Sequence, residues 1–68
     1  MKSNLHDISV IFQHRTERAV CIRETEAGAD IWIPLSQCEI EARDGDLQRG
    51  CVAVLTAAEP VLLEKGLI

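Results

Sequence analysis

The segment IWIPLSQCEIEA, residues 31–42, decides the fold class of this chain. Its first part is rich in β-branched and aromatic residues and predicts a strand over residues 30–34. This strand ends at Pro34, because proline has no N–H to donate to a strand ladder. Residues 35–37 predict a tight turn, and in residues 38–42 apolar and acidic side chains alternate with the two-residue period of a strand. The segment therefore predicts two consecutive strands joined by a turn.

The same alternation assigns side chains to faces. Glu39 and Glu41 are predicted to face outward from their strand, while the apolar residues between and beside them face inward. Trp32 stands between Ile31 and Ile33 and should point away from the face that those two share. Two interpretations of Trp32 remain: it covers a second small core under a helix, which we favour, or it anchors a partner.

Residues N-terminal to this segment predict a β-hairpin. The run over residues 8–14 places Ile8, Val10 and Phe12 on one face of a strand. Four polar residues follow, and residues 19–24 are again rich in β-branched side chains. Two such runs separated by a short polar turn are typical of a hairpin.

Residues after the segment predict one more strand. Residues 43–50 form a charged loop bracketed by glycines, and residues 51–55 are nearly all apolar. We expect that strand to be covered on both faces and to lie centrally in the sheet.

A short helix is predicted to close the chain. Thr56 and Glu59 have the spacing of a capping box, in which each side chain satisfies one N–H of the first helical turn. Pro60 is tolerable in that first turn, and Gly66 suits the position just after the helix. The apolar tail, residues 67–68, should fold back onto the sheet. The fold class is α+β: a single domain over residues 1–68 with a small antiparallel sheet of about five strands and one C-terminal helix, or a helix-capped half-barrel.

Composition bounds the function. Sixty-eight residues exclude a large enzyme fold, and 47% hydrophobic residues indicate a chain that folds. The net charge of −4 disfavours general binding to nucleic acid or anionic lipid. The N-terminus lacks the apolar region of a secretory signal, and no stretch is long enough to span a membrane, so we expect a cytoplasmic protein.

Catalytic and metal chemistry find no support in the motifs. The odd set of cysteines, Cys21, Cys38 and Cys51, contains no C-x-x-C pair, so we expect packed thiols rather than disulfides or a metal site. His6 and His14 have no nucleophile beside them, and the glycines form no phosphate-binding motif. We predict a protein that is not an enzyme and uses no cofactor.

The charge distribution is uneven. Seven of the eleven acidic residues fall between residues 24 and 46, where Arg43 is the single base. Carboxylates two residues apart on a strand are roughly 6.7 Å apart, which is comparable to the spacing of phosphates along a nucleic-acid strand. If they converge on one face, they could bind a basic, nucleic-acid-binding surface of another protein; the alternative is that they only confer solubility. The predicted partner-binding residues are Glu24, Glu26, Asp30, Glu39, Glu41, Asp44, Asp46 and, as an anchor, Trp32.

Residues 31–37 resemble the W-I/L-P-x-S-Q segment of a group of short phage and prophage proteins, and the Lys65–Ile68 end resembles their K-G-L-I terminus. The chain departs from the group at Pro60, where an aromatic is usual, and at Ala58, where a proline is usual. The resemblance implies a small α+β protein of a mobile element, without known catalysis. Small acidic proteins of such elements are often inhibitors of host defence, among them anti-CRISPR proteins that imitate nucleic acid.

We therefore expect a phage-type inhibitor that binds a basic surface of a host complex, such as a CRISPR effector subunit, as a monomer or weak homodimer without membrane contact. A second reading is a structural or accessory phage module that self-associates through a face built around Trp32 and Leu35. A third is direct nucleic-acid binding by Arg15, Arg18 and Arg23.

Overall fold

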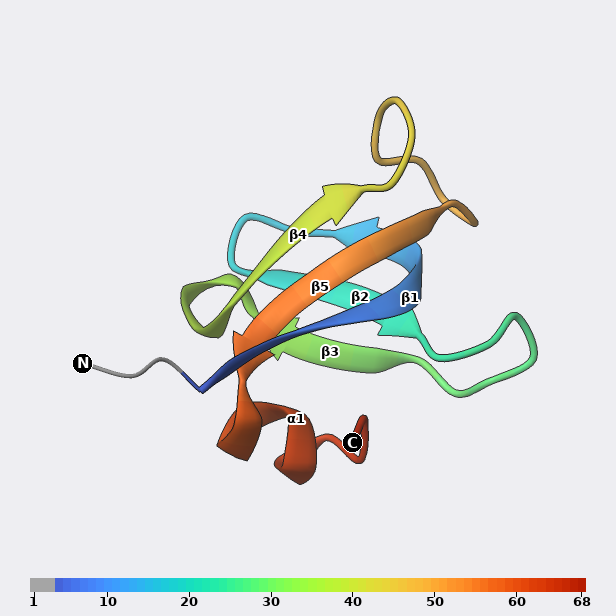
Figure 1. Cartoon of the computed structure of the whole chain (residues 1–68). Helices are drawn as coiled ribbons and strands as arrows, with labels where there is room; N and C mark the ends of the chain where they lie inside the picture. Colours follow the sequence, from blue (N-terminus) through green and yellow to red (C-terminus); the bar gives the residue numbers. More distant parts are fainter. Residues whose placement is uncertain (1–3) are drawn as a thin grey trace.

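The computed structural model describes residues 4–68 and contains one antiparallel sheet and one short α-helix (Figure 1). The strand order across the sheet is β3-β2-β1-β5-β4, so β1 is central and β3 and β4 are the edges. This confirms the predicted α+β class with five strands and a C-terminal helix. The elements are β1 (Leu5–Arg15), β2 (Ala19–Arg23), β3 (Ile31–Pro34), the 3₁₀ turn η1 (Leu35–Gln37), β4 (Cys38–Ala42), β5 (Val52–Ala58) and α1 (Glu59–Glu64).

The two longest strands, β1 and β5, extend beyond their predicted bounds. β1 begins at Leu5, three residues before the apolar run, and β5 continues to Ala58. The extra residues pair with one another, from Leu5 opposite Ala58 to Asp7 opposite Thr56. Cross-strand pairing thus extends the strands through residues such as Asp7 and Ala57, which have little strand propensity of their own. β5 lies inside the sheet with a partner strand on each side, but the prediction that both of its faces are covered is wrong, because Val52 on its outer face is 40% exposed.

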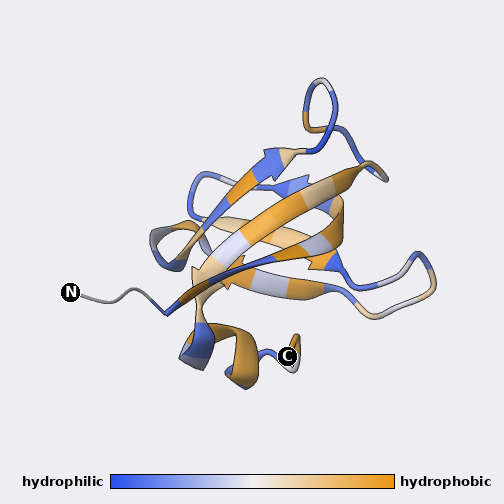
Figure 2. Cartoon of the chain, viewed as in Figure 1, coloured by the Kyte–Doolittle hydropathy of each residue, from blue (hydrophilic) through white to orange (hydrophobic). Residues whose placement is uncertain are grey.

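A single core lies on the inner face of the sheet. A six-residue helix is too small to cover five strands, and the sheet itself is curled (Figure 1). The curl encloses the apolar side chains of the inner face. Figure 2 shows hydrophobic residues concentrated in the strands and most hydrophilic ones in the connections. The buried core residues are Val10, Phe12, Val20, Ile22, Ile33, Ala53, Leu55, Ala57 and, from the helix, Leu62.

The predicted capping box at Thr56 is wrong. Thr56 lies within β5, the N-cap of α1 is Ala58, and no side chain caps the helix. The Thr56 hydroxyl instead donates a 2.6 Å hydrogen bond to Oδ1 of Asp7 on β1. Threonine favours strands as well as helix caps, and here pairing with β1 continues the strand past it. Pro60 is in the first helical turn, as predicted.

The C-terminal end of α1 follows the prediction for Gly66. Its φ is +74°, which a residue with a side chain rarely adopts. The N–H of Leu67 donates to the carbonyl of Leu62 at 2.8 Å and the N–H of Gly66 to that of Leu63 at 3.1 Å, which is a Schellman motif. Leu67 packs against the core, whereas Ile68 is 50% exposed, so only the first half of the tail returns to the sheet. Over residues 4–68, no helix is long and apolar enough to cross a membrane.

Candidate partner-binding surface

The structure divides the seven predicted carboxylates into three groups. Two groups lie at the β4 end of the sheet, on β4 itself and on the β4–β5 loop, while the third lies on the β2–β3 loop. In Figure 1 the two loops leave the sheet at well-separated places. The seven therefore do not form one continuous row. The groups are Glu24, Glu26 and Asp30 on the β2–β3 loop, Glu39 and Glu41 on β4, and Asp44 and Asp46 on the β4–β5 loop.

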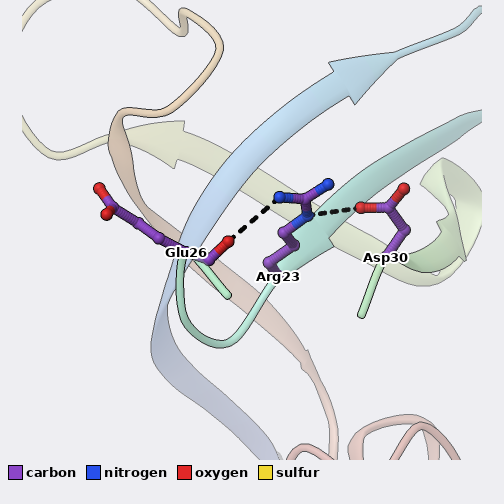
Figure 3. A network of polar contacts seen from close by, with 3 residues as sticks. All are labelled: Arg23, Glu26 and Asp30. Atoms are coloured by element: carbon purple, nitrogen blue, oxygen red, sulfur yellow. Dashed lines mark hydrogen bonds and ion pairs between the residues drawn. The ribbon is translucent and has the colours of Figure 1, made fainter. Parts of the chain in front are cut away.

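The β2–β3 loop folds over Arg23, the last residue of β2 (Figure 3). The Arg23 guanidinium donates from Nε to Oδ1 of Asp30 at 2.6 Å and from Nη1 to the backbone carbonyl of Glu26 at 3.1 Å. Asp30 is thereby paired within the molecule, and the Glu26 carboxylate points away from Arg23. The loop offers a partner less negative charge than its sequence indicates, because one of its three carboxylates is already matched.

The outer face of β4 meets a further carboxylate that the sequence analysis missed. Glu39 is opposite Thr56 on β5, and Thr56 is opposite Asp7 on β1. Glu39 and Asp7 thus flank Thr56 in one row across three strands, roughly 10 Å apart. In the sequence Asp7 precedes the apolar run of the first strand. Only the extended pairing of β1 with β5 reveals that it belongs to this face.

We call Asp7, Glu39, Glu41, Asp44 and Asp46 the β4 acidic surface. All five residues are exposed. The ion pairs found within residues 4–68 are His6 with Glu59 and Arg23 with Asp30, so none of the five carboxylates is neutralised by a cation. Asp7 accepts the hydrogen bond from Thr56, and Arg43 reaches across the same face to donate to Oγ of Ser9. The surface therefore carries five carboxylates and has two arginines nearby: Arg43 on the same face, and Arg15, which lines a hollow together with Glu39 and Glu41.

Trp32 lies on the outer face of β3 and is 45% exposed. The interpretation of a second core under the helix is wrong, because the buried residue of α1 is Leu62, which belongs to the inner core. Trp32 is opposite Cys21, and its ring meets His14 edge-on, with centroids 6.1 Å apart and an interplanar angle of 80°. Leu35 packs against the inner core. Trp32 and Leu35 therefore do not share the face proposed for self-association.

The arginines of the first hairpin are also not one cluster. Arg23 is held by Asp30 and the carbonyl of Glu26, whereas Arg15 and Arg18 are exposed near the β1–β2 turn. The hypothesis of direct nucleic-acid binding required all three arginines, and one of them, Arg23, is held in an internal ion pair.

The three cysteines are free thiols. Burial raises the pKa of Cys21 above its ordinary value, to which the nearby Asp30 charge adds, and burial likewise raises the pKa of Cys38. Within residues 4–68 no group of three histidine, cysteine or carboxylate side chains is arranged to hold a metal ion.

Comparison with protein-family models, with curated proteins and with solved structures finds no match to this chain.

Proposed function

We propose that this protein is a non-enzymatic inhibitor of phage type, which binds a basic, nucleic-acid-binding surface of a host defence complex. A subunit of a CRISPR effector is the proposed partner. The observation that carries the proposal is the β4 acidic surface, whose exposed carboxylates come from β1, β4 and the β4–β5 loop and form no ion pair within residues 4–68. The resemblance of residues 31–37 and 65–68 to phage proteins supports the biological setting.

The chemistry of the surface suits arginine and lysine donors. Glu39 and Glu41 are roughly 6.7 Å apart along β4. Asp7 lies in a second line, which runs from Glu39 across the strands through Thr56. The oxygen of Thr56 gives its proton to Asp7 and keeps lone pairs that can accept a further hydrogen bond. A face of negative and neutral acceptors resembles the edge of a nucleic acid, whose phosphates and sugars accept hydrogen bonds from basic grooves. Complementary potential would speed association and fix its orientation.

The β2–β3 loop and Trp32 are not part of the main binding surface in this proposal. Both lie toward the β3 edge, away from β4 in the sheet order. Glu24, Glu26 and Asp30 are therefore assigned to a secondary contact or to solubility. Trp32 would anchor a partner only through a separate contact.

The experiment is capture from a host lysate with tagged protein as bait. We expect the wild type to retain a nucleic-acid-binding protein or complex that is released by double-stranded DNA and by salt, because exposed charges are screened within about 8 Å at physiological ionic strength. The variant E39Q/E41Q/D44N/D46N should lose that partner. The variant E24Q/E26Q, which removes two charges from the β2–β3 loop, is the control for a different location and should keep it. Equal capture by all three baits, or a partner that DNA does not displace, would contradict the proposal.

A second candidate is an accessory phage module that self-associates. It is favoured by the exposure of Trp32, Val52 and Leu5, three large apolar side chains on the outer face of the sheet. Sizing chromatography separates the two: an oligomer that survives high salt and is lost in W32A supports self-association, whereas a monomer at low and high salt removes it.

A further inference from the structure

An open hollow of about 500 Å³ lies between the end of β1 and the residues that precede β5. Its charged lining consists of cations or potential cations alone: His14 and Arg15 from β1, and Arg49 from the β4–β5 loop. Gln13 and Gln48 also line it. No carboxylate does, although the chain as a whole is acidic. We call this the basic hollow.

The backbone on both sides of the basic hollow is held in place. The N–H of Phe12 donates to the carbonyl of Cys51 at 2.9 Å, and the N–H of Gly50 donates back to the carbonyl of Phe12 at 2.7 Å. A turn closed by the N–H of Cys51 and the carbonyl of Gln48 precedes this pairing. Gly50 has a φ of +88°, which lets the chain make that turn directly after Arg49. Arg49 is thus carried on a tight turn that is hydrogen-bonded to β1.

A β-bulge shapes the β1 side of the hollow. Phe12 is opposite Ile22 and His14 is opposite Cys21, so Gln13 is the extra residue of β1. Such bulges redirect the side chains that follow them and are frequent at binding sites. The His14 ring is further fixed by its edge-on contact with Trp32.

The two guanidinium groups are available to a ligand. The ion pairs within the described part of the chain involve His6 and Arg23, and neither involves Arg15 or Arg49. A guanidinium presents a planar fork of N–H donors that matches phosphate oxygens in pairs. A flat carboxylate is satisfied by one such fork, whereas a tetrahedral phosphate has enough oxygens to accept hydrogen bonds from both arginines. We propose that the basic hollow is a binding site for a phosphate group.

The surroundings favour a small phosphate-bearing molecule over a long nucleic acid. Arg15 also lines a neighbouring hollow whose other side carries Glu39 and Glu41. A polyanion that continued past Arg15 would meet these carboxylates, while a compact phosphate would not. This site does not depend on the proposed function, because it uses none of the residues of the β4 acidic surface.

The test uses the fluorescence of Trp32, the single tryptophan of the chain, which contacts His14 at the margin of the hollow. Inorganic phosphate is titrated at constant ionic strength, with chloride replaced as phosphate is added. We expect a saturable change with half-saturation in the low millimolar range. The variants R15Q and R49Q should each weaken binding by about tenfold or more, as loss of a charge-assisted bidentate contact does. R18Q is the matched control, because Arg18 lies on the β1–β2 turn and does not line the hollow.

Amide chemical shifts provide a second readout that does not depend on Trp32, and changes should centre on residues 12–15 and 47–50. A short single-stranded DNA at equal phosphate concentration separates the two sources of phosphate. If the DNA binds no more tightly than free phosphate, the result supports a small phosphate-bearing ligand. If the DNA binds more tightly and R15Q and R49Q abolish that binding, the site is one for nucleic acid. The absence of a saturable response in both readouts, or an equal response from R15Q/R49Q and wild type, would overturn the proposal. The unfolding temperature of each variant is first compared with that of the wild type. We expect it to be unchanged, because Arg15 and Arg49 are exposed.

Discussion

The hydroxyl of Thr56 donates to the Asp7 carboxylate across β1 and β5, 49 positions away in the sequence. Local pattern alone assigned this hydroxyl to a helix cap, because Thr-x-x-Glu has the spacing of a capping box. The neighbouring residues do not distinguish a threonine that caps a helix from one that lies in a strand, because apolar residues accompany both. The deciding partner lies on another strand, and the end of β5 could not be predicted without it.

A double-mutant cycle tests this contact. Thr56→Val and Asp7→Ala should couple by about 0.5 kcal/mol in the free energy of unfolding, a modest value because both side chains are accessible to water. The measurement is urea denaturation of the wild type, the single variants and the double variant. The control cycle pairs Thr56→Val with Glu59→Gln and should give a coupling near zero. A larger coupling to Glu59 than to Asp7 would restore the capping box.

Cysteine reactivity is a second prediction for single residues. Cys21 is 3% exposed and burial raises its pKa, so at a given pH it holds less reactive thiolate than an ordinary cysteine. At about pH 8, close to the ordinary thiol pKa, we expect iodoacetamide to modify Cys21 more slowly than the half-buried Cys51. Peptide mass spectrometry of timed samples measures the order. In denaturant the two rates should become equal, and equal rates in the folded protein would contradict the assigned burial.

At the scale of elements, the alternation of apolar and polar residues predicts the strands, whereas the helix depends on its packing against the sheet. The alternation of residues 38–42 predicted β4 and its two faces, since burial of one face imposes a two-residue period. The six residues of α1 are too few for an isolated helix to be stable in water. Its stability comes from Leu62, which is fully buried in the sheet core, and from the Gly66 end.

The neighbouring leucines of α1 provide a matched test. Leu62→Ala should lower the free energy of unfolding by about 2–5 kcal/mol, because it leaves a cavity in the core. A domain of this size has roughly 3–10 kcal/mol in total, so a large fraction should unfold. Leu63→Ala, at a side chain that is 56% exposed, should change stability by less than about 0.5 kcal/mol. Chemical denaturation measures both, and equal losses would mean that α1 does not pack as described.

At the scale of the whole molecule, the strand order decides what the charges can do. The sequence places the seven carboxylates in one block, but the order β3-β2-β1-β5-β4 separates the β2–β3 loop from β4. The same order brings Asp7 and Glu39 into one row on either side of Thr56, which no linear pattern indicated. Class, strand number and the outward direction of Glu39 and Glu41 could thus be predicted. The membership of the acidic surface could not, because it depends on which strands pair.

The central claim is that the partner binds the β4 acidic surface rather than responding to net charge. Two double variants test it directly, since E39Q/E41Q and E24Q/E26Q remove the same charge from different elements. The measurement is the dissociation constant for the captured partner at low and physiological salt. We predict that E39Q/E41Q weakens binding by about tenfold or more and flattens its salt dependence, while E24Q/E26Q stays within about twofold of the wild type. Equal losses of affinity in the two variants would contradict the account, because they would show that only total charge matters.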